Sequence, residues 1–297
     1  MKRLLLRSAA ALVLPALALT GCSLFPTTRK LPVPKVPTVT QTIAPEELVD
    51  QLNKRWVGVN ALTATVEIQA TVLKTGEGVA KDFPSCRGFI LMRKPDNLRV
   101  VAQYFGVRIF EISSDGSRFT LSIPQKSKAI EGSNKLAKRS TNQLENLRPG
   151  FFFDAMIVRG LEPDDFYSVI ADTETVEDAQ KKHLYAVPEY VLSITRHNPG
   201  SHIDIPVRVV TFHREDLLPY QQDLYDDKGN LETEVFYSKY ADFGGARYPS
   251  VVIIKRPIEG IQLVMTVERV VENPNPPLTD SQFQIKLAEG TAIQHLD

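Results

Sequence analysis

The sequence predicts an α+β, mainly β fold: one large open antiparallel sheet of about 11–12 strands with a few helices. Residues 62–72 alternate apolar and polar side chains without interruption, which is typical of a strand with one buried face. Similar short segments, separated by turn sequences, recur before and after residues 133–182. No Gly/Ser linker or charge run divides residues 45–297, so we expect a single domain there.

An amphipathic helix is predicted at residues 45–58, PEELVDQLNKRWVG. Pro45 suits the first turn of a helix, and the two glutamates that follow it complement the positive end of the helix dipole. Leu48, Leu52 and Trp56 are four residues apart and therefore form one apolar face. We expect this face to be buried.

The strand predicted at residues 62–72 places six apolar side chains on one face: Leu62, Ala64, Val66, Ile68, Ala70 and Val72. Further strands of this first meander are expected at residues 86–94, 98–105, 107–114, 118–123 and 127–132. Asp115-Gly116 lies between two of these segments and is a typical hairpin turn.

Residues 133–182 interrupt the strand pattern. Residues 134–147 and 148–161 are compatible with helices, whereas residues 163–182 are mixed and polar and are expected to form a surface stretch. We therefore expect an excursion with one to three helices. Strands resume at residues 183–197, 206–214, 218–227, 231–240, 246–256 and 261–271, and in the last of these Leu263 and Met265 share one face.

Residues 1–21 have the parts of a secretory signal peptide: a basic start, a short apolar run and small residues at its end. The run is shorter than the roughly 20 residues that span a bilayer, and an uncleaved N-terminal anchor is the alternative. Leu19-Thr20-Gly21-Cys22 resembles the bacterial lipobox, which implies that Cys22 carries a diacylglyceryl lipid and becomes the first residue of the mature chain. Residues 22–44 contain four prolines and no helix or strand period, so we expect a lipidated cysteine followed by a Pro-rich tether.

Charge and cysteine content narrow the possible partners. Without residues 1–21, the chain has 32 basic and 35 acidic side chains, so nucleic acid is not an expected partner. Membrane attachment is expected to come from the acyl chains on Cys22. Cys86 then has no partner within the chain, and we expect it to be buried and inert rather than paired between molecules.

This combination resembles the LolA/LolB-like superfamily of periplasmic lipoprotein carriers and acceptors. The similar segments are ELVDQLNKRWVGVNALTATVEIQ near the start, and ARYPSVVIIKRP and IQLVMTVERVVENPNPPLTDSQFQI near the end. The last segment closes with Pro277, Leu278, Asp280, Phe283 and Ile285. The resemblance implies an unclosed half-barrel at residues 45–297, with helices on the concave side and an apolar cavity for acyl chains.

The resemblance also implies a function and a location. We expect an outer-membrane lipoprotein that faces the periplasm and binds lipid or lipoprotein acyl chains in lipoprotein localisation or lipid transfer. Ser23 follows the lipidated cysteine, where an aspartate would retain an enteric lipoprotein in the inner membrane. The alternative is a non-enzymatic envelope scaffold or stress sensor with the same fold, with a protein partner at the exposed sheet edge or in the excursion.

The candidate ligand site consists of apolar residues on the expected inner face and helices. A plain hydrophobic core has the same pattern, but a large sheet curls and two or three helices cover its concave side only partly, which favours a cavity. Phe151–Phe153 suit either the cavity face of a lid or an interfacial helix that touches the membrane. The predicted cavity residues are Trp56, Val66, Ile68, Phe151, Phe152, Met156, Leu263 and Met265.

No nucleophile elbow, P-loop, HExxH or CxxC motif occurs, so we expect no enzyme, no cofactor and no metal site. His197, His202 and Asp204 are close in sequence, but polar loop residues explain them better than metal ligands do. The sequence DDKGN at residues 226–230 is likewise explained by a hairpin turn rather than by cation binding.

Overall fold

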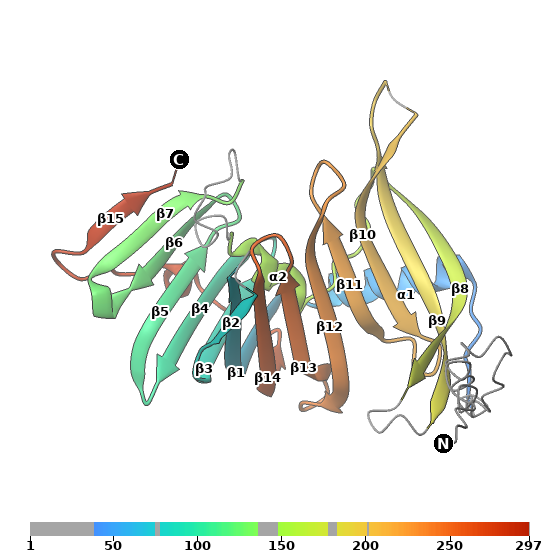
Figure 1. Cartoon of the computed structure of the whole chain (residues 1–297), viewed down its shortest axis with the longest axis horizontal. Helices are drawn as coiled ribbons and strands as arrows, with labels where there is room; N and C mark the ends of the chain where they lie inside the picture. The colour runs from blue at the N-terminus through green and yellow to red at the C-terminus, as the bar shows by residue number, and fades with distance from the viewer. Residues whose placement is uncertain (1–38, 75–77, 136–147, 178–182, 201, 297) are drawn as a thin grey trace, which may run out of the picture.

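The structure is a computed structural model of the 297-residue chain and describes residues 39–74, 78–135, 148–177, 183–200 and 202–296 (Figure 1). Cys22 and Ser23 lie outside the described residues, as does the helix-compatible segment at residues 136–147. The described helices are α1 (Pro45–Gly58), α2 (Gly150–Met156) and the short 3-10 helices η1 (Pro124–Lys126) and η3 (Asp280–Phe283).

The strands form one unclosed sheet of 15 members, which confirms the mainly β half-barrel with helices on one side. They are β1 (Ala61–Lys74), β2 (Val79–Asp82), β3 (Cys86–Arg93), β4 (Asn97–Tyr104), β5 (Val107–Ser114), β6 (Arg118–Ile123), β7 (Lys128–Ser133), β8 (Asp165–Glu177), β9 (Leu184–His197), β10 (Asp204–His213), β11 (Pro219–Tyr225), β12 (Leu231–Asp242), β13 (Arg247–Arg256), β14 (Ile261–Glu272) and β15 (Ala292–His295).

The strand order is β15-β7-β6-β5-β4-β3-β1-β14-β13-β12-β11-β10-β9-β8, and β2 pairs with β1. All neighbours are antiparallel except β15 and β7, which are parallel. The centre of the sheet is therefore the pair β1 and β14, which come from opposite ends of the chain. In their register Val66 lies opposite Val267, and Ile68 lies opposite Met265.

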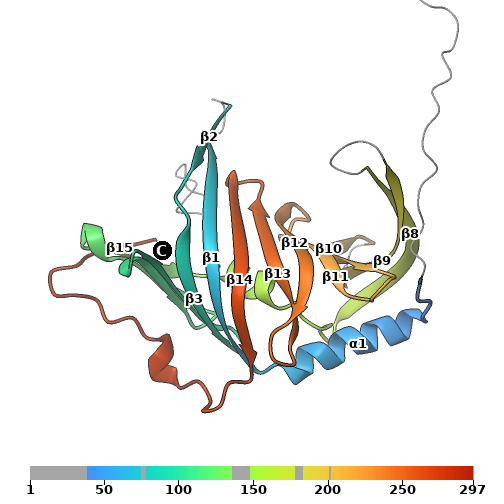
Figure 2. The same cartoon turned by 90° about the horizontal axis from the view of Figure 1, so that it is seen from below.

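Both α-helices lie on the inner, concave side of the sheet (Figure 2). Leu48, Val49 and Leu52 are the buried residues of α1, so the predicted helix and its apolar face are confirmed. In α2 every residue from Phe151 to Met156 except Asp154 is buried. One continuous hydrophobic cluster joins these helices to the inner face of the sheet.

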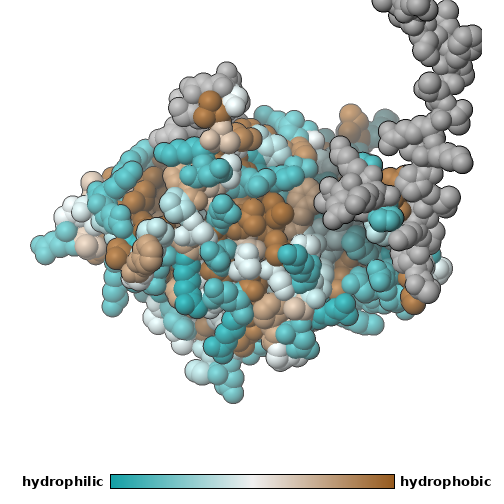
Figure 3. All heavy atoms as spheres, turned by 60° about the horizontal axis from the view of Figure 1, so that its bottom comes forward, coloured by the Kyte–Doolittle hydropathy of each residue, from teal (hydrophilic) through white to brown (hydrophobic). Residues whose placement is uncertain are grey.

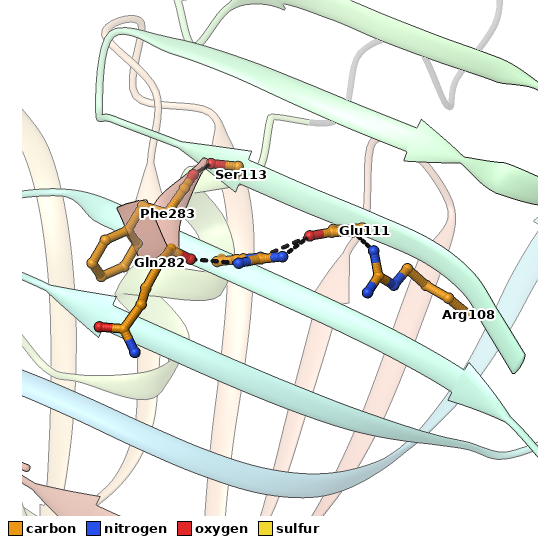
Figure 4. A network of polar contacts seen from close by, with 6 residues as sticks. Arg108, Glu111, Ser113, Gln282 and Phe283 are labelled. Atoms are coloured by element: carbon orange, nitrogen blue, oxygen red, sulfur yellow. Dashed lines mark hydrogen bonds and ion pairs between the residues drawn. The ribbon is translucent and has the colours of Figure 1, made fainter. Parts of the chain in front are cut away.

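Residues 273–291, which we call the C-terminal strap, leave β14 and run over the outer face of β3–β5 before β15 pairs with β7 (Figure 2). Leu278 and Phe283 are its buried side chains. Figure 4 shows how polar contacts hold it: Arg99 donates to the Gln282 carbonyl at 2.7 Å, and Ser113 donates to the Phe283 carbonyl. The buried Glu111 carboxylate is bridged by Arg99 and Arg108 beside these contacts.

The sequence prediction missed three strands: β2, β8 and β15. β2 and β15 have only four residues each, and most of their side chains are exposed. β8 was expected to be part of the polar surface stretch, and that expectation is wrong. Its side chains are exposed on both faces, so the sequence lacks the alternation that reveals a strand with one buried face.

Candidate functional site

The inner face of the central strands is an apolar surface. Val66, Ile68 and Met265 are buried there, and all three were predicted from the period-two alternation. Gly88 lies opposite Val66 on β3, where a Cβ would be only 2.6 Å from Ile68 Cδ1. This glycine therefore leaves room for the Ile68 side chain.

Helix α2 covers this surface with aromatic side chains. Phe151 and Phe152 are stacked, with ring centroids 4.5 Å apart, and Phe153 makes an edge contact with Trp56 of α1 at 6.5 Å. Met156 is buried at the end of the same helix. The sequence left open whether this aromatic segment faces the interior or a membrane, and in the structure it is buried between the sheet and α1.

All eight predicted cavity residues belong to or contact the same hydrophobic cluster. Six are buried members, whereas Trp56 and Leu263 are partly buried and pack against it. The structure brings these residues together as a packed core. Their use as a ligand site stays a prediction.

Polar side chains of the sheet hold the carbonyl groups at and beyond the C-terminal end of α2. The Tyr248 hydroxyl donates to the Met156 carbonyl at 2.5 Å, and Gln222 Nε2 donates to the Asp154 carbonyl at 2.9 Å. Arg208 Nη2 donates to the Gly160 carbonyl farther along the chain. The last carbonyls of a helix have no partner within it, so these contacts satisfy groups that would otherwise be buried without a hydrogen bond.

An arginine joins α2 to α1 and to the β3–β4 turn. Arg159 forms ion pairs with Asp154 at 2.5 Å and with Asp96 at 2.6 Å. Its guanidinium also lies over the rings of Phe153 and Trp56, with the guanidinium carbon 4.7 and 5.6 Å from the ring centroids. α2 is therefore fixed by polar contacts at one end and by aromatic contacts along its length.

A small cavity of about 30 Å³ lies beside Met156 and is also lined by Tyr237, Tyr240 and Tyr248. This volume suits about one water molecule and is far too small for an acyl chain. Burial raises the pKa of Tyr237 and Tyr248 well above the usual range, so both hydroxyls remain protonated donors. An acyl chain therefore does not fit into this cavity as it stands in the structure.

The sequence reasoning missed the polar residues that hold α2. Arg208 shares its face with Val210 and Phe212 on β10, and Gln222 lies opposite Val210 on β11. The sequence did contain one sign of such residues, namely a polar side chain at a position of a strand where the alternation predicts an apolar, inward-facing one. The carbonyl groups that they bind lie more than 45 residues away in the sequence, so their partners could not be predicted.

A second apolar feature lies at one end of the strands β13, β14, β1, β3, β4 and β5, and we call it the apolar rim. It contains the exposed side chains Leu73, Val79, Phe83, Tyr104, Phe105, Val107 and Ile258. Figure 2 shows its β1–β2 hairpin and β13–β14 turn at the same end of the central strands. A backbone hydrogen bond from Leu73 to Gly260 joins these two turns.

Phe105 is the most exposed residue of the rim, with 91% of its surface accessible. Its φ of 47° lies in the left-handed region, which asparagine or glycine would occupy more easily. The tight β4–β5 turn therefore exposes a large apolar ring, and its backbone is strained at this residue. Figure 3 shows one face of the molecule, on which apolar side chains form patches among polar ones.

The remaining sequence candidates have local structural roles. His197 and Asp204 are 3.1 Å apart across the β9–β10 pair, and Asp226 accepts hydrogen bonds from the amides of Lys228 and Asn230 in its turn. Within the described part of the chain, no group of three His, Cys, Asp or Glu side chains could hold a metal ion. Cys86 is buried with a free thiol, and burial, followed by the charge of Glu67, raises its pKa.

Among the described helices, none is long and apolar enough to cross a membrane. No family model matches the sequence, and no curated protein matches it. Solved structures with a similar arrangement do exist, and the three described below share little sequence with this chain.

A LolA superfamily protein from Nitrosomonas europaea has a TM-score of 0.49 and 16% identity, over 82% of this chain and 99% of that chain. A DUF1329 family protein from Desulfovibrio piger ATCC 29098 has a TM-score of 0.47 and 16% identity, over 80% and 95%. An outer membrane lipoprotein-sorting protein domain from Vibrio parahaemolyticus has a TM-score of 0.46 and 12% identity, over 80% and 94%. With similarity this low, what the chain does must be inferred from its own residues.

Proposed function

We propose that this chain is a lipid-anchored envelope protein that binds the acyl chains of lipids or lipoproteins on the inner face of its half-barrel. It would act in lipoprotein localisation or lipid transfer at the outer membrane, without covalent chemistry. The observation that supports this most is the apolar inner face of the sheet, which is covered at its centre by a helix of only seven residues. Each Å² of apolar ligand surface removed from water would contribute about 25 cal/mol.

Helix α2 would be the element that an acyl chain displaces. A helix this short is not stable alone, so its conformation depends on its contacts with the sheet and α1. An acyl chain could replace the apolar contacts of Phe151, Phe152 and Met156 with its own. The hydrogen bonds from Tyr248 and Gln222 to α2 would have to open, at about 1 kcal/mol each, as would the ion pair between Arg159 and Asp154.

The membrane anchor belongs to the same proposal. Cys22 would carry the diacylglyceryl and acyl lipid, residues 23–44 would be the tether, and Ser23 would direct the protein to the outer membrane. The apolar rim would bring the half-barrel into contact with the membrane surface from which a cargo chain is taken or to which it is delivered. These parts connect an anchor, a contact surface and a cargo site in one chain.

The experiment compares two tyrosine variants of the chain without residues 1–21, with Cys22→Ser so that no lipid is attached. Tyr248→Phe removes the hydrogen bond to α2. Tyr240 lines the same small cavity, but Tyr240→Phe removes a hydrogen bond to the Pro219 carbonyl and none to α2. We expect Tyr248→Phe to bind 12-(9-anthroyloxy)stearate about fivefold more tightly than the parent chain, because about 1 kcal/mol less is needed to free α2. Tyr240→Phe should bind as the parent does.

Fluorescence titration gives the affinities, and mass spectrometry of lipid extracted from the purified parent chain identifies any natural ligand. Equal affinities in both variants would show that α2 does not control access. A chain that carries no lipid and binds no acyl probe in any variant would contradict acyl-chain binding itself.

A further inference from the structure

The two ends of the sheet differ in how their edges are protected. At one end the short β15 pairs with β7 and limits the exposed edge to four residues. At the other end β8 is 13 residues long and, among the described residues, pairs only with β9 (Figure 1). This pairing runs from Asp165 opposite Arg196 to Glu177 opposite Leu184 without a register shift.

Strand β8 lacks several of the features that usually prevent a sheet edge from pairing with another chain. It contains no proline, no lysine and no β-bulge. All its residues except Asp165 and Val169 are exposed. Phe166 and Ile170, four residues apart on one face, expose 59% and 57% of their surfaces, so the edge offers apolar contacts as well as main-chain groups.

The charge of β8 indicates which kind of strand would pair with it. The strand carries four carboxylates and no basic side chain. Asp165 is paired with Arg196 at 2.7 Å, whereas Asp172, Glu174 and Glu177 have no ion pair with a described residue. A second copy of β8 in antiparallel register would bring like charges together, which is unfavourable. A segment with lysine or arginine side chains would instead be attracted.

We propose that β8 binds an extended, basic segment of a partner polypeptide as an additional strand of the sheet. Main-chain hydrogen bonds from the free edge would supply the affinity, and alternate side chains of the segment would contact Phe166 and Ile170 on one face. Asp172, Glu174 and Glu177 would select basic partners. This interaction would use the sheet edge and not the inner face, so it does not depend on acyl-chain binding.

The test uses the purified full chain in detergent micelles and a synthetic nine-residue lysine–valine peptide, Thr-Lys-Thr-Lys-Thr-Val-Thr-Val-Thr. Its lysines and valines share one face of an extended strand, as the carboxylates of Asp172 and Glu174 share one face of β8 with Phe166 and Ile170. Two further versions of the peptide carry N-methyl groups on the even or on the odd residues. Only one set of amides faces the edge of a neighbouring strand, so methylation of that set should abolish binding and methylation of the other should leave it unchanged. Fluorescence anisotropy of a labelled peptide measures each affinity.

The protein variant is the double substitution Asp172→Lys and Glu174→Lys. We expect it to bind the lysine–valine peptide at least about tenfold more weakly and to bind a glutamate–valine peptide instead. Glu46→Lys with Glu47→Lys makes the same change in net charge on the exposed side of α1 and should bind as the parent does. Hydrogen exchange should slow at β8 amides when the lysine–valine peptide is added.

Other results would overturn the proposal. If both methylated peptides bind equally well, the peptide adsorbs electrostatically and does not pair with a strand. If both charge variants lose the same affinity for the peptide, the carboxylates of β8 are not its binding site. A dimer in sedimentation that excludes the peptide, or β8 edge amides already protected in the free chain, would show that a second copy or the chain itself occupies the edge.

Discussion

At the scale of single residues, Glu189 on β9 shows how burial couples the fold to pH. Burial raises the pKa of this carboxyl group, the hydrogen bond from the Tyr220 hydroxyl opposes the rise, and the charges of Glu174 and Asp172 add to it. The folded chain therefore holds a proton on Glu189 more tightly than the unfolded chain does. The stability gained in this way is complete below the ordinary glutamate pKa of 4.5 and is lost as the pH rises through the higher pKa of the folded state.

Glu189→Gln should remove this pH dependence while it keeps a side-chain oxygen for Tyr220. We expect the free energy of unfolding of the parent chain to fall relative to that of the variant as the pH is raised from about 4 to about 7. Burial lowers the pKa of the adjacent His213, which acts in the opposite direction but is present in both proteins. Urea denaturation at several pH values measures the difference.

The control is Glu289→Gln, a change of the same chemistry at an exposed position. Its stability should run parallel to that of the parent over the same pH range. Parallel curves for Glu189→Gln as well would mean that Glu189 titrates alike in the folded and unfolded chains.

Single residues also show what the sequence can and cannot predict about the candidate site. Val66, Ile68 and Met265 were placed correctly on the inner face because side chains alternate with a fixed period along a strand. The contacts of Tyr248 and Gln222 with α2 could not be predicted, because each joins segments that only the complete sheet brings together. The alternation of apolar residues thus predicts which face of the sheet a side chain lies on, but not which distant residue it contacts.

At the scale of elements, the C-terminal strap depends on one buried carboxylate. Glu111 is almost fully buried on the outer face of β5, between Arg99 and Arg108. Arg99 in turn donates to the Gln282 carbonyl of the strap. If Glu111 loses its charge, both arginines lose the group that orients them, and the strap loses a rigid anchor.

Glu111→Gln should therefore lower the free energy of unfolding by about 2 kcal/mol, because it breaks a buried charge network whose arginines are partly exposed. Hydrogen exchange at residues 278–285 should become faster than in the parent. Glu268→Gln breaks an ion pair with Arg87 whose two side chains are 45% and 60% exposed, and it should cost less than about 1 kcal/mol. Similar effects of the two substitutions would show that the strap does not depend on Glu111.

The elements that the sequence did not reveal share a physical cause. The central strands, buried on one face, were predicted at the right places in the sequence and with the right side-chain direction, whereas the pairing of β1 with β14 was not predicted. Edge strands such as β8 and β15 are held by main-chain hydrogen bonds to a neighbour, and their side chains are exposed on both faces. Their sequences show no alternation of apolar and polar residues, so these strands are identified only by their hydrogen bonds to a neighbouring strand in the structure.

At the scale of the whole molecule, the surfaces that could carry function are separated. The inner face and α2 form the candidate cargo site, the strap covers the outer face of β3–β5, and β8 is the open edge. The strand pattern predicted a large open antiparallel sheet, and the half-barrel shape was implied by the family resemblance of the sequence. In the structure α2 packs against the inner face, and the pattern of apolar residues alone does not set its position.

The apolar rim leads to a prediction about how the whole molecule meets a membrane. Phe105→Asn should weaken binding of the Cys22→Ser chain to phosphatidylethanolamine–phosphatidylglycerol vesicles by about tenfold, because the ring no longer enters the apolar part of the bilayer surface. Its stability should not decrease, since asparagine adopts the φ of 47° more readily than phenylalanine. Vesicle flotation and thermal denaturation measure the two effects.

The matched control is Val57→Asn, which removes an exposed apolar side chain from α1, outside the rim. Valine and asparagine have similar helix propensities, so this variant should fold and bind vesicles as the parent does. If Val57→Asn weakens binding as much as Phe105→Asn, the membrane is contacted by apolar side chains in general and not by the rim. If neither weakens it, the unlipidated chain binds vesicles through a surface other than the rim. If the Cys22→Ser chain binds no vesicles at all, attachment rests on the lipid proposed at Cys22, and Cys22→Ala in the full chain should then release the protein from the membrane fraction.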